Sequence, residues 1–183
     1  MMDENKHSYA GDSMRRVEDE EMITGAGCYT DDLQFPEMTH LHFVRSPYPH
    51  AKIKKMDLSA AMESEGVLAI YTADDLIRDG VNPYPIPGPP GDFVTQEILD
   101  RGYRNGNGEP MDPPRWLALA KDEVRYVGQP VVAILAESAE NALTASELVE
   151  VDYEELASVG TIQDAEKESA PAIWKGAPGN LLI

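Results

Sequence analysis

Two patterns of apolar residues predict strands in both halves of the chain. In some segments apolar and polar residues alternate, as expected for a strand with one wet face, and in others apolar residues follow one another, as in a buried strand. The second pattern is clearest at 130–135, where the sequence PVVAIL is apolar throughout. The strands that we predict on this basis lie at residues 41–45, 51–58, 66–71, 130–135 and 149–153.

Side chains that stabilise helix N-termini stand ahead of three short segments. Ser and Thr side chains satisfy free backbone N–H groups at that position, and glycine commonly ends a helix. The first predicted helix covers 60–63, is capped by Ser59 and is ended by Gly66. The second is opened by a capping box between Thr72 and Asp75. The third covers 139–148 and is capped by Ser138.

The segment from 130 to 153 is predicted to form a strand, a helix and a second strand. Two strands joined through a helix normally lie parallel in one sheet, with a right-handed crossover. We therefore expect a β-α-β element near the C-terminus, with strands 130–135 and 149–153 as a parallel pair.

Proline and glycine concentrate in residues 80–114, which hold eight of the 14 prolines and six of the 14 glycines. Because proline fixes φ and removes a backbone donor, this stretch predicts a long surface loop. Residues 1–14 are polar and lack periodicity, and therefore predict a flexible N-terminal arm. The folded domain is expected to extend from 15 to 180.

The chain has 183 residues, of which 42% are hydrophobic, and a formal net charge of -18. This apolar content allows a packed core and argues against general disorder. Acidic residues concentrate at 137–168, and Lys and Arg form no block longer than the pairs Arg15–Arg16 and Lys54–Lys55. An acidic surface repels phosphate groups, so a nucleic-acid partner is not expected.

Cys28 is the only cysteine, so the chain forms no internal disulfide, and we expect Cys28 to be a small buried residue in a reducing compartment. The polar N-terminus is unlike a signal peptide, and no sequence run approaches the roughly 18 apolar residues that span a bilayer. We therefore expect a cytoplasmic location without a membrane partner.

Residue chemistry alone offers no self-sufficient active site. His40 and His42 would share one face of a strand with Glu37 nearby, which allows a divalent metal site but more often describes ordinary surface residues. His50 is expected to stabilise the proline-rich turn that precedes it. The sequence contains no P-loop, nucleophile elbow or complete dinucleotide fingerprint, so no catalytic, cofactor-binding or metal-binding residue is predicted.

Six short strings form an ordered set along the chain: RVED at 16–19, TGAGCYTDDL at 24–33, RSPYPHA at 45–51, GV at 66–67, VRYVGQPV at 124–131 and ELVEVDYEEL at 147–156. In order and spacing they resemble the start of the molybdenum-binding large subunit of the xanthine dehydrogenase, aldehyde oxidase and carbon monoxide dehydrogenase family. The resemblance covers about residues 15–180, apart from the proline-rich insertion, and leans toward the bacterial carbon monoxide dehydrogenase-like branch.

The resemblance implies an α/β hammerhead domain, that is, a fold of the α+β class with the β-α-β element near its C-terminus and the long proline- and glycine-rich loop. In this family the hammerhead precedes the domains that hold a molybdopterin-type molybdenum cofactor, and partner subunits hold iron–sulfur clusters and FAD. The family's cofactor loops and catalytic glutamate have no counterpart here, so the chain is expected to be an excised domain or a naturally split subunit that binds no cofactor alone. Candidates for an interface with the cofactor domains or partner subunits are Arg15, Arg16, Arg45, Gly128 and Gln129.

Three functions remain open on this basis. The first is a structural and assembly domain of a molybdenum hydroxylase, which is not catalytic alone. The second is a stand-alone, non-enzymatic interaction module that keeps the fold without the enzyme. The third is a small acidic cation-binding protein that uses His40, His42 and the acidic clusters.

The predicted loop at 80–114 gives a testable expectation. In limited proteolysis of the isolated chain, the first cuts should fall within these residues, because exposed proline- and glycine-rich segments lack the packing that protects a backbone. Uniform resistance of the chain to the protease would contradict a surface loop here.

Overall fold

The computed structural model describes residue 13 and residues 16–84, 116–175 and 177–180. Contacts divide the chain into two compact units, Met1–Met38 and Thr39–Ile183. The predictions of an arm at 1–14 and a loop at 80–114 fall on residues that, apart from 13 and 80–84, lie outside the described ranges. Tyr84 and Trp116, the described residues on either side of 85–115, form an isolated antiparallel bridge.

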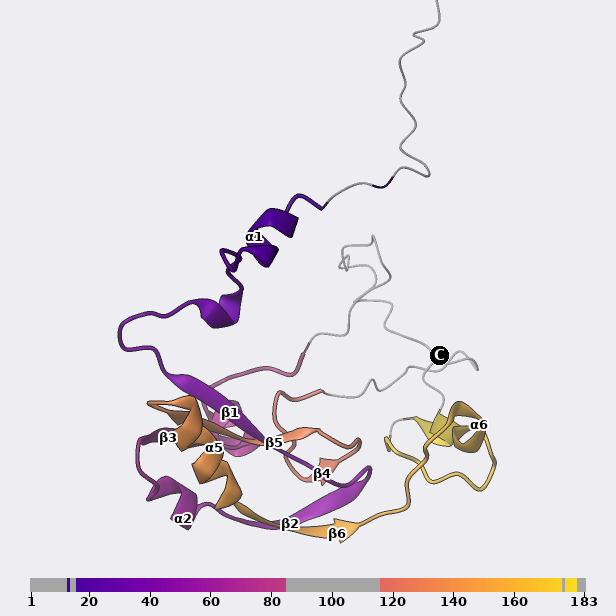
Figure 1. Ribbon diagram of the computed structural model, residues 1–183. Helices are drawn as coiled ribbons and strands as arrows, with labels where there is room; N and C mark the ends of the chain where they lie inside the picture. Colours follow the sequence, from indigo (N-terminus) through magenta and orange to yellow (C-terminus); the bar gives the residue numbers. More distant parts are fainter. Residues whose placement is uncertain (1–12, 14–15, 85–115, 176, 181–183) are drawn as a thin grey trace, which may run out of the picture. The chain divides into compact units, whose positions relative to one another are not determined.

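The first sheet of the Thr39–Ile183 unit has three antiparallel strands in the order β1-β5-β3 (Figure 1). Their bounds are His40–Arg45 for β1, Pro130–Ala136 for β5 and Val67–Tyr71 for β3. The central strand β5 is the apolar run PVVAIL extended by one alanine, and Val131, Val132 and Ile134 are fully buried. Its apolar sequence is explained by neighbours on both edges and both faces.

Helix α5 (Ala139–Glu147) covers one face of this sheet and contacts all three strands. Its buried residues are Ala142 and Ala145, whose small side chains allow the helix backbone to approach the strands closely. The predicted cap is confirmed, since the Ser138 side chain accepts a hydrogen bond from Asn141 N at 3.1 Å. The short helix α2 (Ser59–Met62) packs on α5 and buries Ala61.

A second, smaller core cluster contains Ala73 and Leu76 from helix α3 (Ala73–Arg78), packed with Leu119 and Ala133. The predicted capping interaction at the start of α3 is confirmed, because Asp75 Oδ2 accepts hydrogen bonds from the Thr72 backbone N at 2.8 Å and from its hydroxyl at 2.7 Å. These hydrogen bonds from Thr72 lower the pKa of Asp75.

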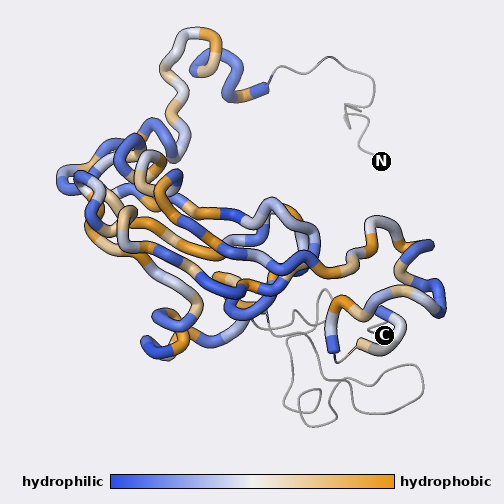
Figure 2. Tube along the Cα trace, turned by 90° about the horizontal axis from the view of Figure 1, so that it is seen from below, coloured by the Kyte–Doolittle hydropathy of each residue, from blue (hydrophilic) through white to orange (hydrophobic). Residues whose placement is uncertain are grey.

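The second sheet also has three antiparallel strands, in the order β4-β2-β6. The strands are β4 (Glu123–Val124), β2 (Ala51–Asp57) and β6 (Glu150–Glu155). The main core cluster joins this sheet to the first, because it combines Ala51 and Val124 with Val131 and Ile134 of β5. Figure 2 shows hydrophobic positions concentrated along the strands of this unit and hydrophilic positions along its outer turns.

The predicted parallel pairing of strands 130–135 and 149–153 is wrong. β5 already has β1 and β3 on its two edges, so it has no free edge for β6. β6 pairs instead with β2, antiparallel, in the other sheet, and its alternating burial suits a strand with one solvated face. The strand–helix–strand order is as predicted, but α5 connects two sheets.

Two further local expectations are corrected. Ser59 lies inside α2 and is not its cap: Leu58 holds that position, while Asp57 Oδ1 accepts hydrogen bonds from the Ser59 backbone N and hydroxyl. Cys28, expected to be buried, is exposed. It lies in the Met1–Met38 unit, whose helix α1 (Asp19–Ile23) and 3-10 helix η1 (Thr30–Asp32) contain no buried residue.

The chain after β6 forms helix α6 (Ile162–Ala165), capped by Thr161, and the short 3-10 turn η2 (Pro178–Asn180). Within the part of the chain that the structure describes, no helix has the length and apolar character needed to cross a bilayer. This result concerns helices alone.

Gly66 gives a test of the packing between the turn before β3 and helix α5. Gly66 has φ +72°, and a Cβ there would lie 1.9 Å from Asn141 Nδ2, whereas Gly80, with φ +81°, has open space around it. Gly80→Ala should cost about 1 kcal/mol from backbone strain alone. Gly66→Ala should cost about 1 to 3 kcal/mol more, because Asn141 must move.

Urea unfolding of the two variants measures this difference directly. Combining Gly66→Ala with Asn141→Ala should remove the extra cost, since the clash is with that side chain. Equal destabilisation by Gly66→Ala and Gly80→Ala would contradict the packing described here.

Candidate functional site

Three of the five predicted interface residues come together where two turns meet. Gly128 N donates to Ser46 O at 2.8 Å, and Ser46 N donates to Gln129 O at 2.9 Å. The Arg45 guanidinium donates to Gly128 O at 2.9 Å. Gly128 has φ +85°, a conformation that favours glycine over residues with a Cβ. The turn at 126–129 is therefore held to the end of β1 by three hydrogen bonds.

The same turn displays two apolar side chains to solvent. Tyr126 is 45% exposed and Val127 is 64% exposed. The Gln129 side chain stabilises the turn, because its Oε1 accepts a hydrogen bond from Arg125 N at 2.7 Å. We refer to Arg45 and residues 126–129 as the turn surface.

The other two candidates belong to the Met1–Met38 unit. Arg16 is exposed and lies in the Met1–Met38 unit, whereas Arg15 lies outside the described residues.

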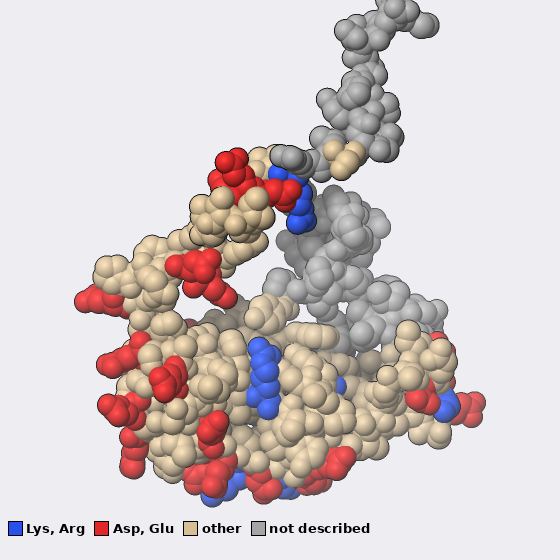
Figure 3. Space-filling view, in the orientation of Figure 1, with Lys and Arg blue, Asp and Glu red and all other residues tan. Residues whose placement is uncertain are grey.

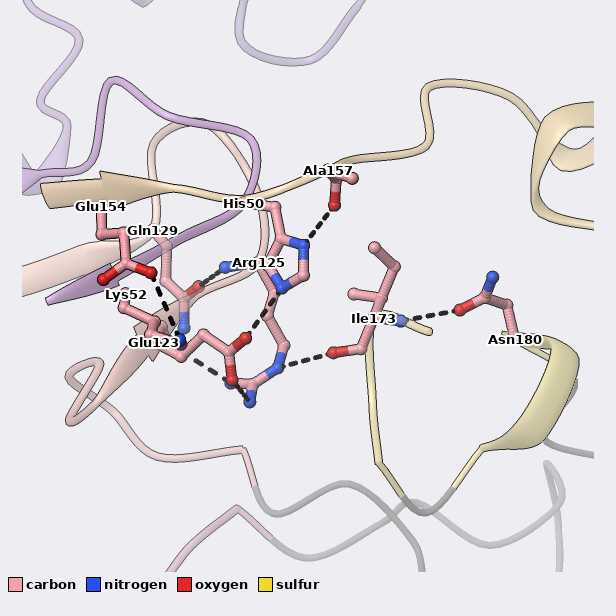
Figure 4. Close-up of polar contacts among 9 residues, drawn as sticks. All are labelled: His50, Lys52, Glu123, Arg125, Gln129, Glu154, Ala157, Ile173 and Asn180. Carbon is pink, nitrogen blue, oxygen red and sulfur yellow. Dashed lines mark hydrogen bonds and ion pairs between the residues drawn. The ribbon is translucent and has the colours of Figure 1, made fainter. Parts of the chain in front are cut away.

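A buried polar network next to this turn was not predicted from the sequence (Figure 4). The His50 side chain is only 5% exposed, and its Nε2 lies 2.9 Å from Glu123 Oε1. Its Nδ1 lies 2.6 Å from Ala157 O. Glu123 Oε2 in turn accepts a hydrogen bond from Arg125 Nη2 at 2.6 Å. The His50 ring thus connects distant parts of the chain, beyond the local role in a turn that we predicted.

Arg125 extends the network to the C-terminal segment, which we define as residues 156–180. Its Nε donates to Ile173 O at 3.0 Å, and its guanidinium lies 4.0 Å from the centre of the Trp174 ring. Trp174 stacks on Trp116 with ring centres 6.0 Å apart. Within the segment, Asn180 Oδ1 accepts a hydrogen bond from Ile173 N at 2.8 Å. These contacts fasten the C-terminal segment to the sheet.

The surface around the network is charged on one side. Lys54 Nζ donates to Glu154 Oε2 at 2.8 Å, and this hydrogen bond lowers the pKa of Glu154 and raises that of Lys54. Burial raises the pKa of Tyr153, on the opposite face of β6. Figure 3 shows acidic side chains gathered along the left and lower edges of the face in view, with basic side chains among them at the lower edge, whereas its middle is mostly uncharged.

The sequence carried a weak signal for this network. Glu123 and Arg125 flank the fully buried Val124 at alternate positions, which places both side chains on one face of the strand and its extension. Their partner His50 is 73 positions from Glu123, and no local pattern connects the two. Only the pairing of β2 with β4 brings them together.

The described residues offer no ligand set for the cation-binding hypothesis. Within the ranges that the structure describes, no three His, Cys, Asp or Glu side chains are placed to hold a metal ion. His40 and His42 lie at alternate positions of β1 and share one of its faces, as predicted, while Glu37 belongs to the Met1–Met38 unit.

Comparison with known proteins defines the class. The family model for the aldehyde oxidase and xanthine dehydrogenase a/b hammerhead domain matches residues 24–102 and 90–157. The chain therefore belongs to this family, that of the molybdenum hydroxylases, and the resemblance read from the sequence strings is confirmed.

Individual relatives agree with this assignment. The chain is 34% identical over 161 residues to the nicotine 6-hydroxylase large subunit of Paenarthrobacter nicotinovorans, covering 84% of this chain and 17% of that protein. A crystal structure of Cu,Mo-CO dehydrogenase matches with a TM-score of 0.61 at 32% identity, over 86% of this chain and 17% of that one. The aldehyde oxidoreductase from Desulfovibrio gigas matches with a TM-score of 0.66 at 28% identity, over 89% of this chain and 16% of that one. The chain thus spans about a sixth of the length of these relatives.

Arg125 offers a test of the network. Replacing Arg125 by Leu removes one of the two partners of the Glu123 carboxylate, which is 20% exposed, and also removes the donor to Ile173 O. The substitution should lower the free energy of unfolding by about 2 to 4 kcal/mol. Arg78→Leu is a matched control, because Arg78 is 69% exposed and its ion pairs with Asp75 and Asp79 lie at the surface.

Denaturant unfolding of both variants gives the comparison. The control should cost less than about 1 kcal/mol, as exposed ion pairs usually do. A similar small effect of both substitutions would contradict a structural role for the network.

Proposed function

We propose that this chain is a structural and assembly domain of a molybdenum-dependent oxidoreductase and that it is not catalytic alone. The observation that carries this proposal is the match of the hammerhead family model across 24–157, in relatives that are large subunits of such enzymes. The molybdenum cofactor would lie in other domains or subunits, since this chain covers only 17% of a relative such as the nicotine 6-hydroxylase large subunit. Iron–sulfur and flavin centres would lie on partner subunits.

The turn surface is the interface that we propose for these partners. It joins an exposed arginine with the exposed side chains of Tyr126 and Val127, and Tyr and Arg are among the residues that contribute most at protein interfaces. Its three backbone-mediated hydrogen bonds hold it in one conformation, which reduces the entropy lost on binding. Arg15 and Arg16 stay candidates for a separate contact.

The polar network of His50, Glu123 and Arg125 is a second observation that supports the same proposal. It fastens the C-terminal segment to the sheet through Arg125 and His50, and so fixes the direction of the chain after β6. A domain that positions other parts of an assembly needs the chain to leave its sheet in a fixed direction.

Co-purification tests the proposal. The gene should be expressed together with the genes that flank it, with an affinity tag on this chain, and molybdenum should be measured per mole of tagged protein. We expect molybdenum to co-purify with the tagged chain, while the 183-residue chain produced alone should contain neither molybdenum nor flavin and show no dehydrogenase turnover. Turnover by the chain alone, or a tagged chain recovered without molybdenum, would contradict the proposal; the second result would favour a stand-alone interaction module.

A substitution in the turn surface tests the proposed interface within the same experiment. Arg45→Glu should lower the recovered molybdenum by about tenfold, because it reverses a charge at the contact. Arg78→Glu, which reverses the charge of an exposed side chain on α3, should leave recovery unchanged. Thermal unfolding of each variant separates loss of binding from loss of folding, and equal recovery with both folded variants would exclude the turn surface.

A further inference from the structure

The C-terminal segment lies outside both core clusters of the Thr39–Ile183 unit. Neither cluster includes a residue of this segment, and among the described residues of the segment only Ala177 is buried. The link between β6 and α6 is exposed at residues 157, 158 and 160. Regions with few buried apolar contacts open at a lower free energy than the core of the same protein. The position of the segment therefore depends on a few specific contacts.

Beyond the link, these contacts gather at residues 173 and 174. The Arg125 guanidinium lies 4.0 Å from the centre of the Trp174 ring, and the Trp116 ring stacks on Trp174 with centres 6.0 Å apart. Arg125 Nε also donates to Ile173 O at 3.0 Å. Over the described residues, this is the one hydrogen bond that joins residues 158–180 to the rest of the Thr39–Ile183 unit. Trp174 is therefore the side chain through which the segment docks.

One side chain ties the segment together internally. Asn180, with φ +59°, accepts a hydrogen bond from Ile173 N at 2.8 Å through its Oδ1. Its Nδ2 donates to Pro171 O at 3.0 Å and to Ala165 O, in α6, at 3.2 Å. A piece of chain this short has no core of its own and does not stay folded when it is detached. The internal hydrogen bonds and the docking contacts therefore form and break together.

We infer that the C-terminal segment beyond Ala157 is one cooperative unit that opens from the folded sheets, and that its opening uncovers Trp116 and Arg125 beside the turn surface. The docked arrangement is the one that the structure describes. Tyr126 of the turn surface stacks on Trp116 with ring centres 6.5 Å apart, so the docked Trp174 and the turn surface share this ring. This inference concerns the fold of the chain and does not depend on the proposed function.

Opening gives the surface around Trp116 two states. In the docked state Trp116 is 50% exposed and stacks on both Trp174 and Tyr126. In the open state Trp116 loses the contact with Trp174, and the Arg125 guanidinium loses both its cation–π partner and its acceptor at Ile173 O. The segment thus controls how much aromatic and cationic surface lies next to the turn surface.

Native-state hydrogen exchange of the wild-type 183-residue chain tests the opening. The reporters are the amides of Ala165, Ile173 and Ala177, which donate hydrogen bonds within the segment, and the references are those of Ala120 and Glu137, which donate beside the first sheet. The three reporters should share one protection factor, about tenfold or more below both references. Reporters as protected as the references would overturn a separate opening, and reporters that differ widely from one another would overturn the cooperative unit.

Exchange at two protein concentrations separates opening within one chain from exchange of the segment between two copies. A swapped segment would make the same contacts in a dimer, and its protection would rise with protein concentration. We expect the same protection of the reporters at both concentrations. Protection that depends on concentration would overturn opening within one chain. Because neither measurement needs a variant, the result does not depend on whether a mutant folds.

Substitutions at Trp174 test its role in docking. Trp174→Ala should lower the protection of Ala165 and Ala177 together by about tenfold, because the aromatic stack and the cation–π contact are both lost. Trp174→Phe keeps an aromatic ring and should restore most of this protection. Ile162→Ala is a matched control, because Ile162 is 76% exposed in the same segment and should leave both amides unchanged.

The amide of Glu137 shows in each variant whether the sheets stay folded, and it should keep its wild-type protection. An effect of Trp174→Ala that is confined to Ala177 and does not reach Ala165 would overturn the cooperative unit. Equal effects of Trp174→Ala and Ile162→Ala would overturn docking through Trp174.

Discussion

The burial of β5 on both faces and both edges is the constraint on which the rest of the Thr39–Ile183 unit depends. β1 and β3 occupy its edges, α5 packs on one face, and the cluster around Leu119 includes its residue Ala133. A strand with no free edge cannot accept another partner, so the chain that follows α5 must form its hydrogen bonds elsewhere. The second sheet exists because β6 pairs with β2, and the shared core at Ala51 and Val124 joins the two sheets.

The polar network and the turn surface are parts of one arrangement. The Gln129 side chain binds the backbone of Arg125, and Arg125 binds both Glu123 and the C-terminal segment. A displacement of the turn therefore shifts the residue that anchors the segment. In a chain that spans about a sixth of the length of its relatives, such a connection links the position of an exposed surface to the direction in which the chain leaves the sheet.

Local sequence patterns predicted the strands better than the way they pair. The apolar run at 130–135, the Ser138 cap and the capping box at Thr72 each act within a few residues, and all three are present in the structure. The partner of β6 depends on which strand edges are already occupied, and that is a property of the whole sheet. The His50–Glu123 contact was missed for the same reason, since its two residues are 73 positions apart. The family resemblance supplied the fold class that periodicity alone did not.

The bridge between Tyr84 and Trp116 has a consequence for how the domain can change over evolution. Tyr84 N donates to Trp116 O at 2.8 Å, so the folded unit itself holds the two ends of the intervening chain together. When the two ends of a flexible chain are held in this way, each doubling of its length adds only about 0.6 kcal/mol of closure entropy. Because the hydrogen bond joins backbone atoms of Tyr84 and Trp116, substitution of either side chain leaves its donor and its acceptor in place, provided that the new residue at 84 is not proline.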